Sequence, residues 1–279
     1  MASNKHFALA TYNVKHFNDE KVAHCREIMA TYSVLFLQEH CLYQSMMGEF
    51  YKIGDINFHG VSAMDESTVR SGRPHGGCAI IWRSNLDCSF TPIDTTSDRI
   101  CAAKMTMSSG TSVLLVNVHL PCDSRFRDEK YQCTTDILDC ISTLIGENEC
   151  DLKVIGGDFN AEMNRTTPHV YALQNFISSN NLLNGLNHPV ANVGFTFESA
   201  GTHSRSLIDH VLACEGLFDN IREYKAIESV DNFSDHMAVI CLFDCSVLER
   251  ERQERIYKKR PAWHKATHDD ITQNFLYLT

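Results

Sequence analysis

The sequence predicts an α/β protein in which mixed β-sheets are flanked by helices. Short apolar runs of strand length recur through the first 244 residues, and segments with helical periodicity lie between some of them. The strands and helices alternate in pairs rather than strictly one for one. Strict alternation would favour a uniformly parallel sheet, so this order favours mixed sheets in one compact domain that ends near Asp244.

Strands and helices are expected in the following order along the chain. A strand over 7–13 ends at Asn13, Asn18 caps a helix, and a buried strand over 34–38 ends at Glu39. A polar stretch over 60–77 predicts a long surface loop. The later strands are expected at 78–82, 100–107, 112–120, 152–160, 195–197, 206–213 and 237–243, and the later helices at 125–145 and 168–180.

Composition excludes several classes of protein. The chain has 279 residues, 43% hydrophobic and 22% charged, which does not fit collagen-like, coiled-coil or largely disordered proteins. No apolar run approaches the roughly 20 residues that cross a bilayer, and the N-terminal segment lacks the layout of a secretory signal. The twelve cysteines are scattered, without a Cys-x-x-Cys pair. We therefore expect a protein that is neither membrane-spanning nor secreted, with buried thiols instead of disulfides or a zinc site.

The net charge of −10 argues against binding nucleic acid through bulk positive charge. From Glu249 onward seven basic residues stand against five acidic ones, so this tail carries +2 and residues 1–248 carry −12. An acidic body is compatible with metal-binding carboxylates. A polyanionic substrate would need a local basic surface, which the totals do not locate.

Polar residues fall at or beside the ends of the predicted strands, where α/β folds assemble their sites. They are Asn13, Glu39, His119, Asp158, Asn160, Asp209, Asp235 and His236. The set supplies hard oxygen ligands for Mg²⁺, an imidazole for a phosphate oxygen, and amides that hold geometry. Phosphate-ester hydrolysis needs this combination.

Each of these residues also has a purely structural interpretation. Asp158 follows two glycines and fits a turn, Asn160 fits a cap, and Asp235 with His236 fits a loop end. The glycines strengthen the functional interpretation, because they let the backbone turn tightly and bring a carboxylate close to a ligand.

Seven segments, in this order, resemble the successive motifs of the endonuclease/exonuclease/phosphatase superfamily, which includes DNase I and the AP endonucleases. They are TYN (11–13), LQEH (37–40), GGCAIIW (76–82), VNVHLP (116–121), GGDFNA (156–161), SLIDHV (206–211) and SDHMAV (234–239). A narrower resemblance is to the endonuclease domain of non-LTR (LINE-type) retrotransposon polyproteins. It lies in GFTFESAGTHSRSLIDHVL (194–212), DNFSDHMAV (231–239) and RPAWHKATHDDI (260–271).

The resemblance implies a four-layer α/β sandwich of two packed mixed sheets flanked by helices, with the site at one edge. It implies a catalytic domain over 1–246 and, over 247–279, a charged helical connector toward a downstream reverse transcriptase region of the same polyprotein. The expected function is nicking of double-stranded target DNA, which leaves a 3′-OH for target-primed reverse transcription. The protein would be made in the cytoplasm and act in the nucleus.

The resemblance also implies a role for each site residue. The metal residues would be Glu39, Asn13 and Asp235: Glu39 would bind Mg²⁺, with Mn²⁺ able to substitute, Asn13 would hold it in place, and Asp235 would lie on the metal side. Asp158 would deprotonate the attacking water, and Asn160 would contact that water or a phosphoryl oxygen. His236, oriented by Asp209, would contact the scissile phosphate, and His119 the phosphate or leaving group.

Two departures from the AP endonuclease pattern keep alternatives open. Lys15 stands where an acid is common in repair-type relatives, and His119 stands where DNA-cleaving relatives often have Tyr. The runner-up is therefore a phosphatase or phosphodiesterase acting on inositol phosphates or phospholipids; a catalytically silent binding module is a third hypothesis. Thr196 and Arg205 belong either to a hairpin presented to DNA or to a plain surface hairpin. The basic cluster over 250–260 fits a DNA contact or a solvated helix.

Overall fold

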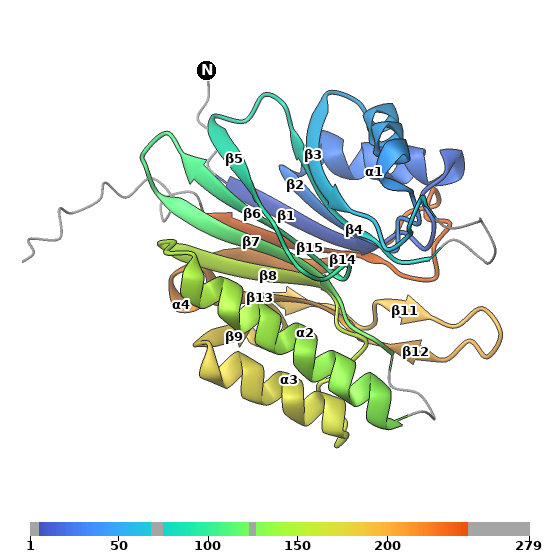
Figure 1. The fold of residues 1–279 in the computed structure, drawn as a ribbon, viewed down its shortest axis with the longest axis vertical. Coiled ribbons are helices and arrows are strands. Elements are labelled where there is room, and N and C mark those ends of the chain that lie inside the picture. The colour runs from blue at the N-terminus through green and yellow to red at the C-terminus, as the bar shows by residue number, and fades with distance from the viewer. Residues whose placement is uncertain (1–5, 68–74, 123–126, 245–279) are drawn as a thin grey trace, which may run out of the picture.

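A computed structural model describes residues 6–67, 75–122 and 127–244 of the chain. Two mixed β-sheets pack face to face, and helices cover their outer faces (Figure 1). This confirms the α/β class and the two packed, helix-flanked sheets. The expected domain boundary at 246 and the connector over 247–279 lie outside the described residues.

The first sheet has seven strands in the order β10-β14-β15-β1-β2-β4-β3. Only β1 with β2 and β10 with β14 run parallel, and the other neighbours are antiparallel. Its strands are β1 His6–Asn13, β2 Val34–Gln38, β3 Ile56–Val61, β4 Cys78–Arg83, β10 Ala191–Asn192, β14 Ile221–Ile227 and β15 Ala238–Asp244.

The second sheet has six strands in the order β5-β6-β7-β8-β13-β9, and β7 with β8 is its parallel pair. Its strands are β5 Cys88–Ile93, β6 Ile100–Met107, β7 Ser112–His119, β8 Leu152–Asp158, β9 Leu182–Asn184 and β13 Asp209–Cys214. A separate two-stranded hairpin joins β11 Phe197–Glu198 to β12 Arg205–Ser206.

The helices begin where their sequences cap them. Asn18 accepts a hydrogen bond from Glu20 N at the start of α1, and Thr167 accepts one from Val170 N ahead of Pro168 in α3. The helical segments are α1 Asp19–Thr31, α2 Arg127–Glu147, α3 Pro168–Ser179 and α4 Glu215–Phe218, with 3₁₀ segments η1 Gln44–Ile53 and η2 Gly185–Asn187. No helix among the described residues is long and apolar enough to cross a membrane.

Three apolar layers hold the sandwich together. The central layer joins side chains of both sheets, such as Phe36 from β2 and Val154 from β8. One outer layer packs α1 and η1 on the seven-stranded sheet, and the other packs α2 and α3 on the six-stranded sheet. Burial on both faces explains why strands such as β7 read as continuous apolar runs. Five of the described cysteines are buried, and all eleven are free thiols.

A polar bridge crosses the central layer next to the site. Asn117 of β7 donates from Nδ2 to the backbone oxygens of Leu37 and Ala79 at 2.7 and 2.9 Å, and Gln38 Nε2 donates to Asn117 Oδ1 at 2.6 Å. Gln38 and Asn117 are fully buried. These bonds fix how the two sheets face each other at the edge where β1, β2, β7 and β8 end.

The strands expected over 195–197 and 206–213 differ in the structure. β11 holds only Phe197 and Glu198, and the second segment splits into β12 and β13. The split arises because β12 pairs with β11 whereas β13 pairs with β8, and the backbone N–H groups of Ile208 and Asp209 donate to Thr196 Oγ1 between them. The loop expected over 60–77 starts after β3, and its residues 68–74 are outside the described part.

Candidate active site

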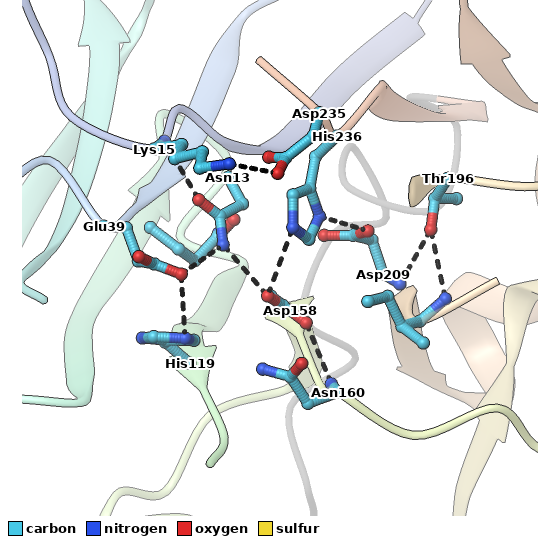
Figure 2. Close-up of polar contacts among 12 residues, drawn as sticks. Asn13, Lys15, Glu39, His119, Asp158, Asn160, Thr196, Asp209, Asp235 and His236 are labelled. Carbon is cyan, nitrogen blue, oxygen red and sulfur yellow. Dashed lines mark hydrogen bonds and ion pairs between the residues drawn. The ribbon is translucent and has the colours of Figure 1, made fainter. Parts of the chain in front are cut away.

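The polar residues expected at the strand ends meet at one edge of the sandwich, across the junction of the two sheets (Figure 2). Asn13 and Glu39 come from the ends of β1 and β2, and His119 and Asp158 from the ends of β7 and β8. Asp209 begins β13 directly opposite Asp158, and the loop before β15 brings in Asp235 and His236. One pocket is lined by Lys15, Glu39, Arg99, His119, Lys130, Asp158, Asn160, Phe197, Ile208, Asp235 and His236, among others.

Asn13 joins the carboxylates of the two sheets. Its Nδ2 donates to Glu39 Oε1 and to Asp158 Oδ2, each at 2.9 Å, and its Oδ1 accepts from Lys15 N at 3.0 Å. Asn13 is fully buried, so its amide is held by these partners. Glu39 has a φ of 52° and follows β2, a conformation that turns the chain out of the sheet. The amide therefore sets the separation of Glu39 and Asp158.

The glycine before Asp158 is required by space and by backbone conformation. Gly157 has a φ of 151°, and a Cβ at this position would lie 1.9 Å from Val118 O in the neighbouring strand. The close approach of β7 and β8 puts His119 and Asp158 in register. Asp158 Oδ1 then accepts a hydrogen bond from Asn160 N at 2.8 Å. The carboxylate is oriented by the turn that follows it.

Asp209 and His236 form a buried pair behind Asp158. His236 Nδ1 lies 3.0 Å from Asp209 Oδ2, and its Nε2 lies 3.9 Å from Asp158 Oδ2. The second distance exceeds a hydrogen bond, so Nε2 is left directed into the pocket. Asp209 and Asp158 are almost completely buried, at 0% and 1% exposure.

The electrostatics of this buried group push two pKa values in useful directions. Burial raises the pKa of Asp158, and the nearby Asp209 carboxylate raises it further. Burial disfavours the imidazolium of His236, but the Asp209 and Asp158 carboxylates outweigh that effect and raise the pKa of His236 to about 9. At neutral pH the site thus holds a cationic ring beside a carboxylate that accepts protons more readily than an exposed one.

His119 stands on the opposite side of Glu39 from the amide of Asn13. Its Nε2 lies 3.3 Å from Glu39 Oε1, and Arg99 Nη1 lies 3.4 Å from its Nδ1. Burial lowers the pKa of His119, against the effect of the Asp158 and Glu39 carboxylates. Arg99 also donates to the backbone oxygen of His119 at 3.2 Å, so the ring is held from the six-stranded sheet.

The carboxylates and imidazoles can hold a divalent metal ion. Among the described residues, two clusters bring ligand atoms within 4.8 Å of one another, Glu39 with His119 and Asp158, and Asp158 with Asp209 and His236. Carboxylate oxygens with an imidazole nitrogen are a fitting donor set for a hard divalent cation. All three residues of the second cluster are buried, whereas the first cluster is partly open to solvent, so the first cluster is the better fit for an ion that must enter. Glu39 is also the more open carboxylate, with 33% of its side chain exposed.

Asp235 lies in the pocket but in neither of these clusters. Its carboxylate forms an ion pair with the ammonium of Lys15, the residue that stands where repair-type relatives carry an acid (Figure 2). The structure therefore gives Asp235 a cation from the chain itself. Its expected position near the metal stays a prediction.

Asn160 and the two expected substrate-binding residues occupy different surroundings. Asn160 lines the pocket and donates from Nδ2 to Leu120 O at 2.8 Å. Thr196 is fully buried and its hydroxyl accepts from the backbone at the root of the hairpin, so it supports Asp209 and does not face substrate. Arg205 is exposed on the hairpin, pairs with Glu198 at 2.8 Å, and lies 4.2 Å from the Phe195 ring centroid.

Sequence inspection did not single out the residues that tie down the loop carrying His236. Asn232 accepts from Tyr12 Oη at 2.7 Å and from Ser234 N at 3.0 Å, and donates to His236 O at 2.8 Å. Ser234 Oγ donates to Asn13 O at 2.8 Å. The one available signal was position, since Asn232 lies within the DNFSDHMAV segment.

Solved structures of nucleic-acid enzymes share this fold. An AP endonuclease from Leishmania major aligns with a TM-score of 0.69 and 13% identity, over 86% of this chain and 88% of that one. The endonuclease domain of TRAS1, a telomere-specific non-LTR retrotransposon, aligns with a TM-score of 0.66 and 14% identity, over 88% of this chain and 100% of that domain's chain. The 3′ phosphatase NExo from Neisseria, bound to product DNA hairpin, aligns with a TM-score of 0.64 and 21% identity, over 85% of this chain and 99% of that one.

The TM-scores show a common fold. Because the sequence identities are low, they leave the substrate open. A search of curated protein sequences finds no match. The family assignment comes from the chain's own sequence, because a family profile matches residues 10–236, from the strand that ends in Asn13 through His236. The chain therefore belongs to the endonuclease/exonuclease/phosphatase family.

Proposed function

We propose that this protein is a divalent-metal-dependent endonuclease that nicks double-stranded DNA and leaves a 3′-OH. The observation that carries the proposal is the continuous polar chain from the open carboxylate of Glu39 through Asn13 and Asp158 to His236. Family membership supports hydrolysis of phosphate esters. The pocket also contains Lys15, Arg99 and Lys130, the local basic surface that an acidic protein needs in order to bind a polyanion.

The chain's own residues divide the work of in-line hydrolysis. Asp158 accepts a proton from the attacking water, whose oxygen bonds to phosphorus as the bond to the 3′ oxygen breaks. The imidazolium of His236, held by Asp209, donates to a phosphoryl oxygen as negative charge develops there. The released 3′ oxygen takes up a proton from solvent water, Asp158 returns its proton to solvent, and the phosphate stays on the 5′ end.

Glu39 would hold the metal ion from the open side of the pocket, with His119 beside it and Asp158, the proton acceptor, at the buried edge of the same cluster. A bound Mg²⁺, or Mn²⁺ in its place, supplies Lewis-acid stabilisation of charge on the phosphate. Asn13 keeps the two carboxylates at a fixed separation whether or not substrate is present. This arrangement is preorganised, so little side-chain movement is needed for reaction.

The retrotransposon origin is the finer part of the proposal. It rests on the sequence segments 194–212, 231–239 and 260–271, and the fold shared with the TRAS1 endonuclease domain is compatible with it. We propose that the nick primes reverse transcription by a downstream region of the same polyprotein, in the nucleus. In the structure, the segment 194–212 forms the β11–β12 hairpin beside the site and the first residues of β13.

The test is incubation with supercoiled plasmid and Mg²⁺. We expect relaxed circles, which DNA ligase reseals without prior phosphorylation because the nick carries a 3′-OH and a 5′-phosphate. EDTA and the substitutions Asp209→Ala and His236→Ala should abolish relaxation. Asp87→Ala, at an exposed carboxylate of the turn between β4 and β5, is the matched control and should nick like the wild type. Plasmid that stays supercoiled with the wild-type protein would refute the proposal.

His119 favours a second candidate function. The histidine at the end of β7 is typical of phosphatases and phosphodiesterases on inositol phosphates or phospholipids, and here it contacts Glu39 and Arg99. The same preparation should therefore be given inositol phosphates and sphingomyelin. Release of phosphate or phosphocholine with intact plasmid would establish this second function in place of the first.

A further inference from the structure

A second groove adjoins the active-site pocket. We call it the side groove; it is lined by Lys15, Phe195, Glu198, His203, Phe233 and Asp235, with neighbouring residues of the hairpin and of the loop before β15. Lys15, Asp235 and His236 line both the side groove and the active-site pocket. A polymer whose phosphate lies against His236 can therefore extend directly into the side groove.

Phe233 presents an exposed aromatic ring on a fixed backbone. The residue is 59% exposed, yet the ammonium of Lys21 donates to its backbone oxygen and lies 5.8 Å from its ring centroid. The preceding residue, Asn232, is held by Tyr12 and Ser234. An exposed aromatic ring on a tied loop beside a catalytic pocket is a ready stacking surface, with little conformational entropy left to lose on binding.

The charges of the side groove admit a phosphate chain. Both acidic side chains already have cationic partners, Asp235 with Lys15, and Glu198 with Arg205. An incoming strand therefore meets no bare carboxylate there. The ammonium of Lys15, with 58% of its side chain exposed, lies at the boundary of the two pockets, where it can donate to a phosphate oxygen while it stays paired with Asp235.

We propose that the side groove binds the nucleotide next to the scissile phosphate, with its base stacked on Phe233 and its phosphate on Lys15. The inference rests on the proposed function and specifies its substrate class as a polynucleotide. A small ester such as an inositol phosphate would fill only the active-site pocket. Stacking on aromatic side chains tolerates any base, so this contact adds affinity without selecting a sequence.

The test compares a duplex oligonucleotide with bis(p-nitrophenyl) phosphate, a diester too small to reach Phe233. With Phe233→Ala, the ratio of kcat/KM on duplex to kcat/KM on the small diester should fall about tenfold, through a higher KM for DNA. Phe233→Trp should restore the ratio. The control is Tyr171→Ala, which removes an aromatic ring of similar exposure from α3 and should match the wild type.

A second readout follows stacking without catalysis. 2-Aminopurine is placed on either side of the cleavage position, and its fluorescence is measured in EDTA on adding wild-type protein or Phe233→Ala. We expect quenching at one position with the wild type and its loss in the variant. If Phe233→Ala has the wild-type KM for DNA and quenches like the wild type, while the wild type nicks plasmid, then nucleotide binding in the side groove is refuted and the proposed function is not. If the wild type nicks no DNA, the proposed function fails and the side groove fails with it.

Discussion

The active site has a buried half and an open half. Asp158, Asp209 and His236 are closed off from solvent, whereas Glu39 has 33% and Lys15 has 58% of its side chain exposed. Burial raises the pKa of Asp158, and the two buried carboxylates raise the pKa of His236 against the effect of burial. The open half is where an ion or a polyanion can enter. In the proposed mechanism, proton transfer falls to the buried half and cation binding to the open half of one pocket.

Breaking the buried half should have the largest effect. Asp209→Asn removes the charge that holds the imidazolium of His236, whose Nδ1 lies 3.0 Å from the carboxylate. We expect the initial rate of plasmid relaxation to fall about 10²–10³-fold, as for loss of one preorganised electrostatic group. Asp87→Asn serves as the exposed control. A rate within twofold of the wild type would show that the buried half does not act in catalysis.

The open half should respond through metal affinity. Glu39→Gln removes a carboxylate of the Glu39, His119 and Asp158 cluster, and we expect the Mg²⁺ concentration for half-maximal nicking to rise at least about tenfold. Calorimetric titration with Mn²⁺ should show the same loss of affinity without any turnover. Asp209→Asn should leave both midpoints unchanged. Equal losses in the two variants would instead place the ion in the cluster of Asp158, Asp209 and His236.

The loop that joins the two halves gives a smaller effect. Asn232→Ala removes its bonds to Tyr12 Oη, Ser234 N and His236 O, so the backbone of His236 loses one of its anchors. We expect kcat to fall about tenfold because a small misplacement of a catalytic group is costly. Tyr12→Phe removes one of these bonds and should cost less. A positioning role requires that the Mg²⁺ midpoint stays at the wild-type value; a shifted midpoint would argue for general disruption.

The smallest expected effect is on the free energy of unfolding and comes from His210, the residue after Asp209. Burial lowers the pKa of His210 to about 4, and its Nε2 lies 2.9 Å from Ala161 O, in the fully buried layer behind the site. In the unfolded chain this histidine takes up a proton near its ordinary pKa of about 6.5. Stability is therefore lost as pH falls from about 6.5 toward 4, by about 1–3 kcal/mol. Urea unfolding at a series of pH values checks this, and His210→Gln should flatten the slope.

The strands that carry the site were predictable because a strand that is buried on both faces has a continuous apolar sequence. β2 and β6 have the predicted ends, and β1 and β8 begin or end within two residues of them. β14 and β5 were not predicted. β5 lies at a sheet edge and has no buried residue, and in β14 only Ile221 and Tyr224 are buried, so neither strand presents an apolar run.

The site was predictable from residue type and strand-end position, but the contacts within it were not. The ion pair of Lys15 with Asp235 spans 220 residues, and nothing local marks either residue as a partner of the other. Thr196 was a candidate substrate-binding residue on a hairpin that could equally be a plain surface hairpin, and its hydroxyl accepts from the backbone N–H groups of Ile208 and Asp209 at the break between β12 and β13. Such contacts depend on how two sheets and a loop meet, which strand-level periodicity does not encode.

The polar bridge between the sheets has a consequence for mutations far from the pocket. Glu39 follows β2 of the seven-stranded sheet, and Asp158 ends β8 of the six-stranded sheet. The hydrogen bond of Gln38, the residue before Glu39, with Asn117 of β7 links the two sheets. A substitution that lets the central apolar layer relax, for instance Phe36→Ala, would change the spacing of the layers and so move one carboxylate relative to the other. The separation of the two carboxylates therefore depends on the packing of an interior that lies away from the pocket.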